Sequence, residues 1–328
     1  KMVDSLSLFF LFIVVAVVAP IGVYSVGYLK EYSKKYSVKY IYFMAFVFIF
    51  SMTGVILSRD SITFMVFWEL MSAASFFLVI VEYDKQQTIK AGITYFIMTH
   101  ISGLLLMLMF GFIFKYTGTF DFSQMNNLYQ ALDKKQLTMI FMLALAGFGA
   151  KSGLVPLHPW LPKAHPAAPS NISAIMSGVM LKIGVYGFLR IYMLFPGKLP
   201  IVVYAIVMLV GAITAVFAIL NALAQDDIKK LLAYSSSENI GVIFGTIGLS
   251  IFFNYLEMSS TAGFVLTSSL LHSMNHAVFK SLLFLTAGAV NSAASSKSMH
   301  DLGGLYSKMK FTAICAFVGT AAISAILP

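Results

Sequence analysis

The stretch GFGAKSGLVPLHPWLPKAHPAAPS, residues 147–170, combines two features that rarely occur in one segment. Lys151 lies at the end of an apolar run, and five of the nine prolines of the chain follow it between positions 156 and 169. Proline fixes φ and lacks a backbone N–H, so an α-helix cannot continue through this stretch. A charged side chain in an apolar segment is therefore followed directly by a broken helix.

The composition of the chain is typical of an integral membrane protein. Of its 328 residues, 59% are hydrophobic and 11% are charged, whereas a soluble domain carries about 25% charged residues. Apolar runs of about 20 residues, the length of a helix that crosses a bilayer, recur along the whole sequence. We predict an all-α, polytopic membrane fold in a single domain over residues 1–328, with about ten transmembrane helices. The predicted spans are 5–28, 40–57, 62–82, 89–114, 137–155, 171–194, 200–223, 231–252, 261–292 and 311–328.

The single cysteine, Cys315, limits the redox chemistry of this chain. One thiol cannot form an internal disulfide, a zinc site or an iron–sulfur cluster. The sequence also contains no nucleotide-binding motif and no metal ligands in cluster spacing. We therefore expect no cofactor in this chain.

The net charge of +9 arises mostly from basic residues in the predicted loops. Loop lysines set the orientation of a membrane protein, so we expect no nucleic-acid partner. If loop 29–39 is cytoplasmic, that side of the membrane collects twelve Lys and Arg residues and the other side collects seven. The excess favours this orientation, with the residues before the first span outside.

Three lysines fall inside predicted spans: Lys151, Lys182 and Lys280. A lysine at the bilayer centre costs about 2.5–3.5 kcal/mol on insertion scales, so it must be paired, hydrated or neutral. A lysine near a helix end can instead extend its ammonium group to the headgroups. Lys182 lies about 15 Å from a helix start near Ile172, which is the middle of a hydrocarbon core about 30 Å thick. This depth is too great for the ammonium group to reach the headgroups.

His272, His276 and Lys280 follow one another at intervals of four residues. This spacing puts all three on one face of their helix, with Ser273 and Asn275 nearby. A lone histidine in a membrane helix more often forms a hydrogen bond between helices than carries a proton. Two histidines and a lysine on one face favour a hydrated polar path, because ionisable groups inside a membrane are functional candidates by default.

Two glutamates also fall within predicted spans. Glu69 lies about 10 Å into its span, counted from Ile62. A buried glutamate and a buried lysine relieve each other's desolvation when their helices touch, so we expect Glu69 to pair with Lys151. Glu238 is open to two interpretations, a polar residue near a helix end or a functional acid.

The clustered prolines predict a discontinuous helix. Non-helical backbone at membrane depth is tolerated only where protein covers it or water lines it. Discontinuous helices beside charged groups occur in ion-translocating proteins, where the freed backbone groups lie at the site. We therefore interpret Pro156, five residues past Lys151, as part of a functional break. We interpret Pro166 and Pro169 as part of a surface loop.

Four stretches account for most of the informative sequence. They are FWELMSAASFFLV, GAKSGLVPLHPWLPKAHPAAPSNISAIMSGVMLKIGVYGFLRI, QDDIKKLLAYSSSENIGVI and LLHSMNHAVFKSLLFLTAGAV, the last followed by DLGG. Together they resemble the antiporter-like, proton-translocating membrane subunits of respiratory complex I, of multisubunit sodium/proton antiporters and of membrane-bound nickel–iron hydrogenases. They occur in family order along nearly the whole chain. Within this superfamily, HPAAPSNISAIMSGVM, AYSSSENIG and NHAVFKSLLFL look most like the hydrogenase 4 and formate hydrogenlyase type.

The resemblance implies two inverted five-helix repeats and a set of site residues. Glu69 matches the glutamate of the family's fifth span, Lys151 the lysine of its broken seventh span and Lys182 the lysine of its eighth span. The matches to the polar eleventh span are His272, His276 and Lys280, and the further candidates are Lys229, Glu238 and His158.

By the same resemblance, the sequence begins at the family's third span and ends at Pro328, inside the twelfth. The family has a second discontinuous helix there, so we expect another break near Pro328. We also expect the chain to be the core portion of a longer subunit.

The intramembrane charges and the resemblance together predict proton translocation. We expect a subunit without redox chemistry of its own, in an oxidoreductase complex of the hydrogenase or NADH:quinone oxidoreductase type. Iron–sulfur, nickel–iron or flavin centres are expected only in partner subunits, which comprise other membrane subunits and a peripheral redox arm. The expected location is a prokaryotic cytoplasmic membrane.

The expected mechanism begins at Glu69, which holds Lys151 charged until a neighbouring subunit draws the carboxylate away. Lys151 then releases its proton toward Lys182, and the polar face of the eleventh span passes it on. One alternative is a sodium/proton antiporter subunit, which exchanges sodium without a redox substrate. Another is a structural scaffold, in which neutralising Lys182 and Lys280 leaves transport unchanged.

Overall fold

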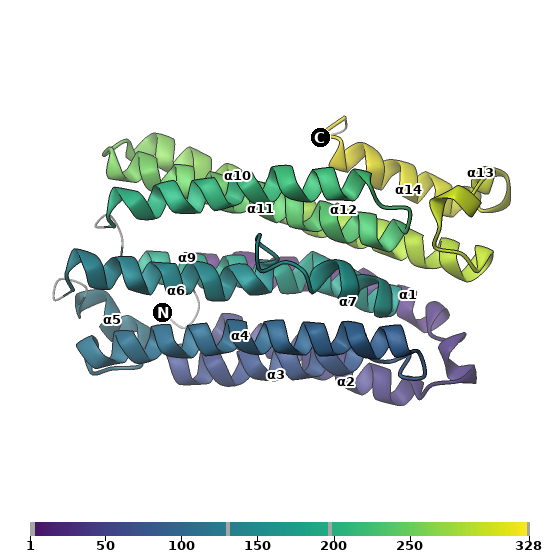
Figure 1. The fold of residues 1–328 in the computed structure, drawn as a ribbon, viewed down its shortest axis with the longest axis horizontal. Helices are drawn as coiled ribbons and strands as arrows, with labels where there is room; N and C mark the ends of the chain where they lie inside the picture. The colour runs from purple at the N-terminus through teal and green to yellow at the C-terminus, as the bar shows by residue number, and fades with distance from the viewer. Residues whose placement is uncertain (1–3, 129–131, 196–198, 327–328) are drawn as a thin grey trace.

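The structure, a computed structural model, describes residues 4–128, 132–195 and 199–326, and within these ranges the chain forms helices and no strand. The long helices lie roughly parallel to one another in three layers (Figure 1). One outer layer contains α2 (Val38–Leu57), α3 (Ser61–Val79) and α4 (Gln86–Thr117). The middle layer contains α1 (Ser5–Tyr28), α6 (Lys134–Ser152), α7 (Leu161–Ala167) and α9 (Leu181–Leu194). The other outer layer contains α10 (Ile201–Leu223), α11 (Ile228–Tyr255) and α12 (Ser259–Ala294).

The membrane-spanning helices agree with the prediction. Eight helices in the described ranges are long and apolar enough to cross a membrane, and they coincide with eight of the predicted spans. The other two predicted spans correspond to α6 and to α14 (Lys310–Ile323), a shorter apolar helix. The all-α membrane fold is thereby confirmed. The break expected near Pro328 lies outside the described residues, and the inverted repeat and the single domain stay predictions.

The centre of the bundle is one span made of three segments: α8 (Ser170–Ile175), a π-helical turn (Met176–Met180) and α9. The most apolar window of this span is 100% buried, against 33% for α1 and for α10. Neighbouring helices therefore cover the span on all sides. A charged side chain on it has no direct contact with lipid headgroups.

The helix that carries Lys151 breaks where the sequence predicts. α6 ends at Ser152, and Gly153 follows with φ of 84°, a left-handed conformation that glycine adopts without steric cost. The chain then continues without helix to α7, which has Pro162 in its first turn, where proline is tolerated. The discontinuity near Pro156 is confirmed, although a glycine rather than a proline ends α6.

Side chains form hydrogen bonds with backbone groups around this break. The Trp160 indole donates to the C=O of Ala150 over 2.8 Å. The N–H of Val155 donates to Thr214 Oγ1 on α10 over 3.0 Å, and Ser237 on α11 donates to another carbonyl of the break. Protein therefore covers the non-helical backbone, as a broken helix inside a membrane requires.

The segment after the break is not a surface loop. Pro166 falls within α7, and Pro169, which is buried, directly precedes α8. The surface-loop interpretation of these two prolines is therefore wrong. The reason is that α7 packs against α4 and α11, and α8 packs against α12, so the segment returns into the bundle.

The loops that we expect in the cytoplasm meet at one end of the bundle. Residues from loop 29–39, from the α3–α4 turn and from the segment after α12 line one cavity of about 610 Å³. Lys35, Lys85 and Lys297 are among its lining residues. The basic loops that the charge count assigns to one side therefore share one end of the structure.

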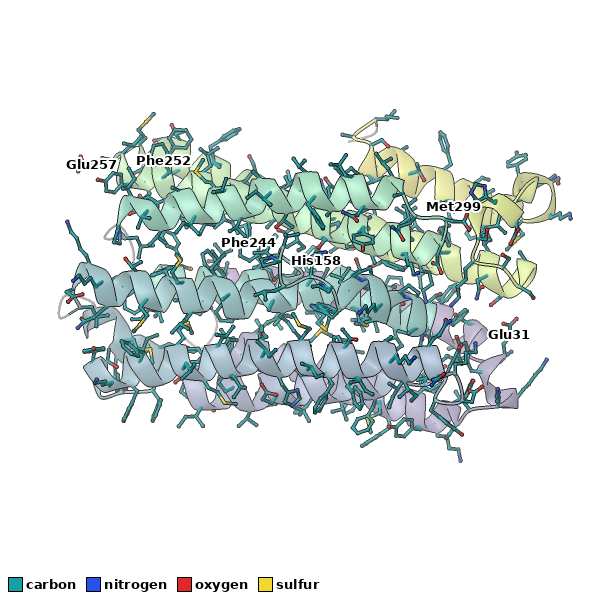
Figure 2. All side chains as sticks on the ribbon, in the orientation of Figure 1. Glu31, His158, Phe244, Phe252, Glu257 and Met299 are labelled. Carbon is teal, nitrogen blue, oxygen red and sulfur yellow. The ribbon has the colours of Figure 1, made fainter. Side chains whose placement is uncertain are left out.

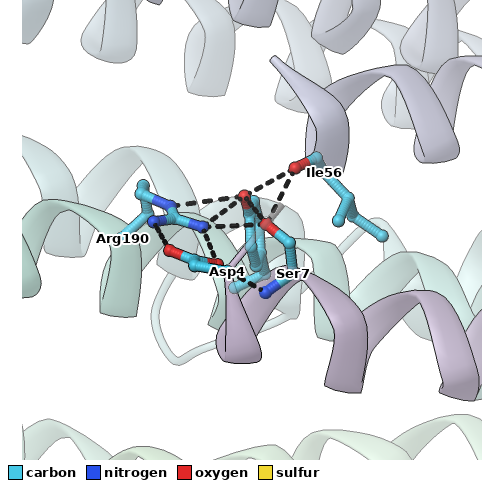
Figure 3. A network of polar contacts seen from close by, with 5 residues as sticks. Asp4, Ser7, Ile56 and Arg190 are labelled. Carbon is cyan, nitrogen blue, oxygen red and sulfur yellow. Dashed lines mark hydrogen bonds and ion pairs between the residues drawn. The ribbon is translucent and has the colours of Figure 1, made fainter. Parts of the chain in front are cut away.

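A polar network fastens α1 to α9 at the opposite end (Figure 3). Arg190 on α9 donates to both carboxylate oxygens of Asp4, which precedes α1, and to Ser7 Oγ. Ser7 donates in turn to the C=O of Ile56 at the end of α2 over 3.1 Å. The guanidinium group holds the pKa of Asp4 at about 2, below its usual 3.8, so the ion pair is fully formed at neutral pH.

Candidate functional site

Lys151 lies in the last turn of α6 and is fully buried. Its Nζ donates to Ser72 Oγ over 2.9 Å and to the Tyr95 hydroxyl over 3.3 Å. The same atom lies 5.9 Å from the centre of the Trp68 ring, whose face attracts a cation. The carboxyl-terminal end of α6 adds a partial negative charge that also favours a cation. Hydroxyls, an aromatic face and a helix dipole thus surround this lysine.

Lys182 lies near the start of α9, directly after the π-helical turn, and is fully buried. Its Nζ donates to the C=O of Ser177 over 2.6 Å. A π-helical turn departs from the usual i to i−4 hydrogen bonding, and such turns are frequent at functional sites. The Ser177 hydroxyl lies 2.8 Å from that of Ser236 on α11. A polar connection therefore joins the central span to α11.

The polar face that the sequence spacing predicts is present on α12. His276 and Lys280 are fully buried, and the rings of His272 and His276 lie 6.5 Å apart. Lys280 Nζ donates to the C=O of Leu232 on α11 over 3.5 Å. Within the described ranges, neither ring nitrogen of His276 has a hydrogen-bond partner. Asn275 is exposed and lies off this face.

Four ionisable side chains act on one another through their charges, and we call them the central cluster: Lys182, His276, Lys280 and Glu238. The charge of Lys280 acts on Lys182, and both lysines act on His276. The Glu238 carboxylate acts on Lys280. Glu238 lies well inside α11, so its interpretation as a helix-end residue is wrong.

Glu69 differs from the prediction in both burial and pairing. Its side chain is 28% exposed, and its Oε2 lies 3.8 Å from Nε2 of His100 on α4. In the part of the chain that the structure describes, Glu69 forms no ion pair with Lys151, although the two charges act on each other through space. In this structure the two side chains therefore do not form the expected direct pair. The reason is that hydroxyls from α3 and α4 bind the ammonium group instead.

Two further candidates lie apart from each other. Lys229, near the start of α11, is 2% exposed, lines the cavity at the loop end of the bundle and donates from Nζ to the C=O of Ala168 over 2.5 Å. His158 lies in the loop after the break, between the middle layer and α10 (Figure 2). Its ring centre is 5.2 Å from that of Phe217. Among the described residues, no hydrogen bond or ring contact joins His158 to the central cluster.

Sequence reasoning missed His165, a fully buried histidine on α7. Its ring stacks on Phe284 of α12 with 4.8 Å between ring centres. The charges that act on it come from Lys229, Lys280 and Lys182. Neither of its ring nitrogens has a hydrogen-bond partner among the described residues. The sequence shows a histidine within the proline-rich stretch. Because Pro166 was assigned to a surface loop, the burial of this histidine was not predicted.

Tyr95 and His100, both on α4, were also missed. The Tyr95 hydroxyl lies 2.6 Å from Ser75 Oγ and 3.4 Å from Met180 Sδ, in addition to its contact with Lys151. It therefore connects Lys151 to the π-helical turn that precedes α9. The signal for both residues is a polar side chain within an apolar run.

The arrangement is suited to holding and passing protons. Titratable groups lie at the lateral surface, where Glu69 faces His100, around Lys151, which contacts Ser72 and Tyr95, and in the central cluster. Within the described residues, no three His, Cys, Asp or Glu side chains gather as ligands for a metal ion.

The sequence matches known membrane subunits. Residues 58–328 match the family described as "NADH:quinone oxidoreductase/Mrp antiporter, TM". The chain is 41% identical to Hydrogenase-4 component B of Escherichia coli (strain K12) over 327 residues, which are 99% of this chain and 48% of that protein. The chain thus spans about half the length of this relative.

Two solved structures contain a chain of similar fold. One is in the Mrp complex from Dietzia sp. DQ12-45-1b, with a TM-score of 0.82 and 26% identity, covering 98% of this chain and 35% of that one. The other is in the membrane-bound sulfane sulfur reductase (MBS), an archaeal respiratory membrane complex, with a TM-score of 0.75. Its 23% identity, over 87% of this chain and 56% of that one, shows similarity of fold alone. The protein is an integral membrane protein and belongs to the NADH:quinone oxidoreductase/Mrp antiporter family of transmembrane chains.

Proposed function

We propose that this chain translocates protons across a prokaryotic cytoplasmic membrane as the antiporter-like subunit of a redox-driven complex. The observation that carries the proposal is the line of buried lysines, since Lys151, Lys182 and Lys280 are each 0% exposed. A lysine at the bilayer centre costs about 2.5–3.5 kcal/mol, and a structural scaffold has no use for three. The Escherichia coli relative, named as a component of hydrogenase 4, supports a redox-driven complex.

The first half of the proposed path uses the contacts of Lys151. With Glu69 turned toward His100, the Lys151 ammonium lacks a directly paired acid, and in this state it passes its proton on. The Tyr95 hydroxyl, which contacts both Lys151 and the π-helical turn, lies on the way to Lys182. When Glu69 moves back to Lys151, its negative charge favours the ammonium form, and Lys151 takes up another proton.

The second half of the proposed path uses the central cluster. Because Lys182, His276 and Lys280 act on one another, a proton bound to one disfavours a proton on the others and promotes its onward transfer. Lys229 and His165 supply protons from the loop end, where the cavity reaches Lys229.

The driving reaction belongs to partner subunits in this proposal. Iron–sulfur, nickel–iron or flavin centres would lie in a peripheral redox arm, and other membrane subunits would lie beside this chain. Both structural neighbours are chains of membrane complexes, which supports membrane partners.

A second candidate function is sodium/proton exchange in a multisubunit antiporter, because a chain of the Mrp complex superimposes over 98% of this chain. The native complex is purified with its copurifying subunits, reconstituted in proteoliposomes and followed with a pH-sensitive dye. Proton movement that needs an electron donor and no sodium supports the redox-driven complex. Proton movement that needs a sodium gradient and no donor contradicts it and supports the antiporter.

A further inference from the structure

His100 lies on the lateral surface of the bundle and faces Glu69. Its Nε2 is 3.8 Å from Glu69 Oε2, and the two side chains are 42% and 28% exposed. The surrounding surface of α3 and α4 is apolar, with large side chains that are exposed by 40% or more: Val66, Ile97, Ile101 and Leu104. At 3.8 Å the two groups form an ion pair whenever His100 is protonated, and the apolar surroundings screen it less than water does.

The backbone of α4 fixes which nitrogen of His100 can change its protonation. Nδ1 lies 3.0 Å from the C=O of Phe96, and a carbonyl only accepts, so Nδ1 carries a hydrogen. The Phe96 ring, 3.9 Å away between centres, holds the imidazole plane. Nε2 is therefore the nitrogen left free of the backbone, and it is the one that faces the carboxylate. A protonated Nε2 attracts ionised Glu69, whereas a neutral Nε2 presents a lone pair to it.

Two cationic side chains act on Glu69 through their charge. The charged groups that act on it are His100, on α4, and Lys151, on α6. The carboxylate rests against the bare backbone of Gly103, where an added Cβ would overlap its Oε1. Glycine at this position gives the carboxylate room beside α4.

We propose that His100 is a positioning residue whose imidazolium form holds the Glu69 carboxylate at the lateral surface, away from Lys151. When Nε2 is neutral, Lys151 is the remaining cation, and the carboxylate moves toward it. His100 thus sets how often Lys151 has an acidic partner. This inference rests on the proposed function, because it assigns a control to the same Glu69 and Lys151 pair.

The inference predicts a specific change in pH dependence. Histidine is the side chain whose charge ordinarily changes between about pH 5 and 8, so the test varies the pH over that range. His100→Gln removes the cation at every pH. We expect this variant to translocate protons, at every pH, at the rate that wild type has at high pH. His100→Lys keeps a cation at every pH. We expect this variant to translocate protons, at every pH, at the rate that wild type has at low pH. The translocation rate should differ from wild type by about two- to fivefold, at low pH for His100→Gln and at high pH for His100→Lys. This is the size of effect that the free energy of a partly exposed ion pair can produce.

The test measures proton translocation by the intact complex in membrane vesicles, driven by its own electron donor, across pH 5.5–8.5 (about the range over which histidine titrates). The matched control is His300→Gln, since His300 Nε2 lies 3.7 Å from Asp226 but its side chain is 89% exposed. We expect this control to follow the wild-type profile. The level of assembled complex is measured for each variant. It separates a failure to fold from a loss of the effect of His100 on Glu69.

A Glu69→Gln variant in the same assay separates this inference from the proposed function. If Glu69→Gln translocates like wild type, the proposed function fails. If Glu69→Gln is impaired while both His100 variants keep the wild-type pH profile, the role of His100 is overturned and the proposed function stands. Complete loss of translocation at every pH in an assembled His100→Gln complex also overturns it, because a positioning residue is not essential.

Discussion

Replacing Lys182 with methionine separates a translocating lysine from a structural one. Methionine keeps an unbranched, flexible side chain of similar length and removes the ammonium group. Lys182 is fully buried on the central span, and its Nζ donates to the C=O of Ser177 over 2.6 Å. We expect the variant to be about as stable as the wild type or more stable and to have lost ion translocation.

The structure sets the size of the stability change. A lysine at the bilayer centre costs about 2.5–3.5 kcal/mol, which the variant recovers. The hydrogen bond that it loses involves a charged donor and contributes about 1.5–3 kcal/mol. The net change in the free energy of unfolding then lies between a loss of about 0.5 kcal/mol and a gain of about 2 kcal/mol for the variant, so most of the range favours it, as for other buried ionic groups replaced by apolar ones.

The assay combines thermal unfolding in detergent with proton translocation in proteoliposomes. Lys163→Met is the matched control, because Lys163 is an exposed lysine on α7, and we expect it to change neither quantity. A loss of more than about 1 kcal/mol in Lys182→Met would show that the ammonium group is a structural contact. Translocation at the wild-type rate would remove Lys182 from the path.

Three further predictions concern the fold. The Arg190 guanidinium helps lower the pKa of Asp4 from 3.8 to about 2, so their ion pair contributes stability above pH 3.8 that disappears as the pH falls through 2. After discounting for exposure, an unfolding series against pH should show a loss of about 1 kcal/mol in wild type and a smaller loss in Arg190→Gln, where the N–H of Ser7 still donates to the Asp4 carboxylate. Gly241→Ala places a Cβ against the backbone of α10 and should destabilise the chain by about 1–3 kcal/mol, whereas Gly22→Ala, with open space around it, should stabilise it by up to about 1 kcal/mol in the same thermal assay. Trp160→Phe removes one of the two donors to the C=O of Ala150, leaving the N–H of Gly153 over 3.4 Å, and should cost about 1 kcal/mol; an unchanged melting temperature would show that the break does not need the indole bond.

The sequence was sufficient to predict the burial of the charges. A lysine inside an apolar run is visible without a structure, and Lys151, Lys182 and Lys280 are all fully buried. The helix break was predictable for the same reason, because proline and glycine restrict the backbone locally. The spans follow from hydropathy, which depends on composition rather than on contacts.

The partner of each charge was not predictable, because it depends on how the helices rotate and pack. Glu69 pairs with His100 rather than Lys151, since α3 presents hydroxyls to the lysine and the carboxylate to the lateral surface. His165 is buried because Phe284 of α12, distant in sequence, covers it. Asn275, one position from buried His276, is exposed. Such differences of one position decide what a membrane helix presents to its neighbours.

The central claim is that Lys151 carries the translocated proton. The most direct measurement is proton translocation per donor oxidised by the reconstituted complex with Lys151→Met, beside Lys163→Met as control. Loss of a proton-transferring group costs about a hundredfold or more, so we predict translocation too low to detect in Lys151→Met and the wild-type ratio in the control. A wild-type ratio in an assembled Lys151→Met complex would contradict the account.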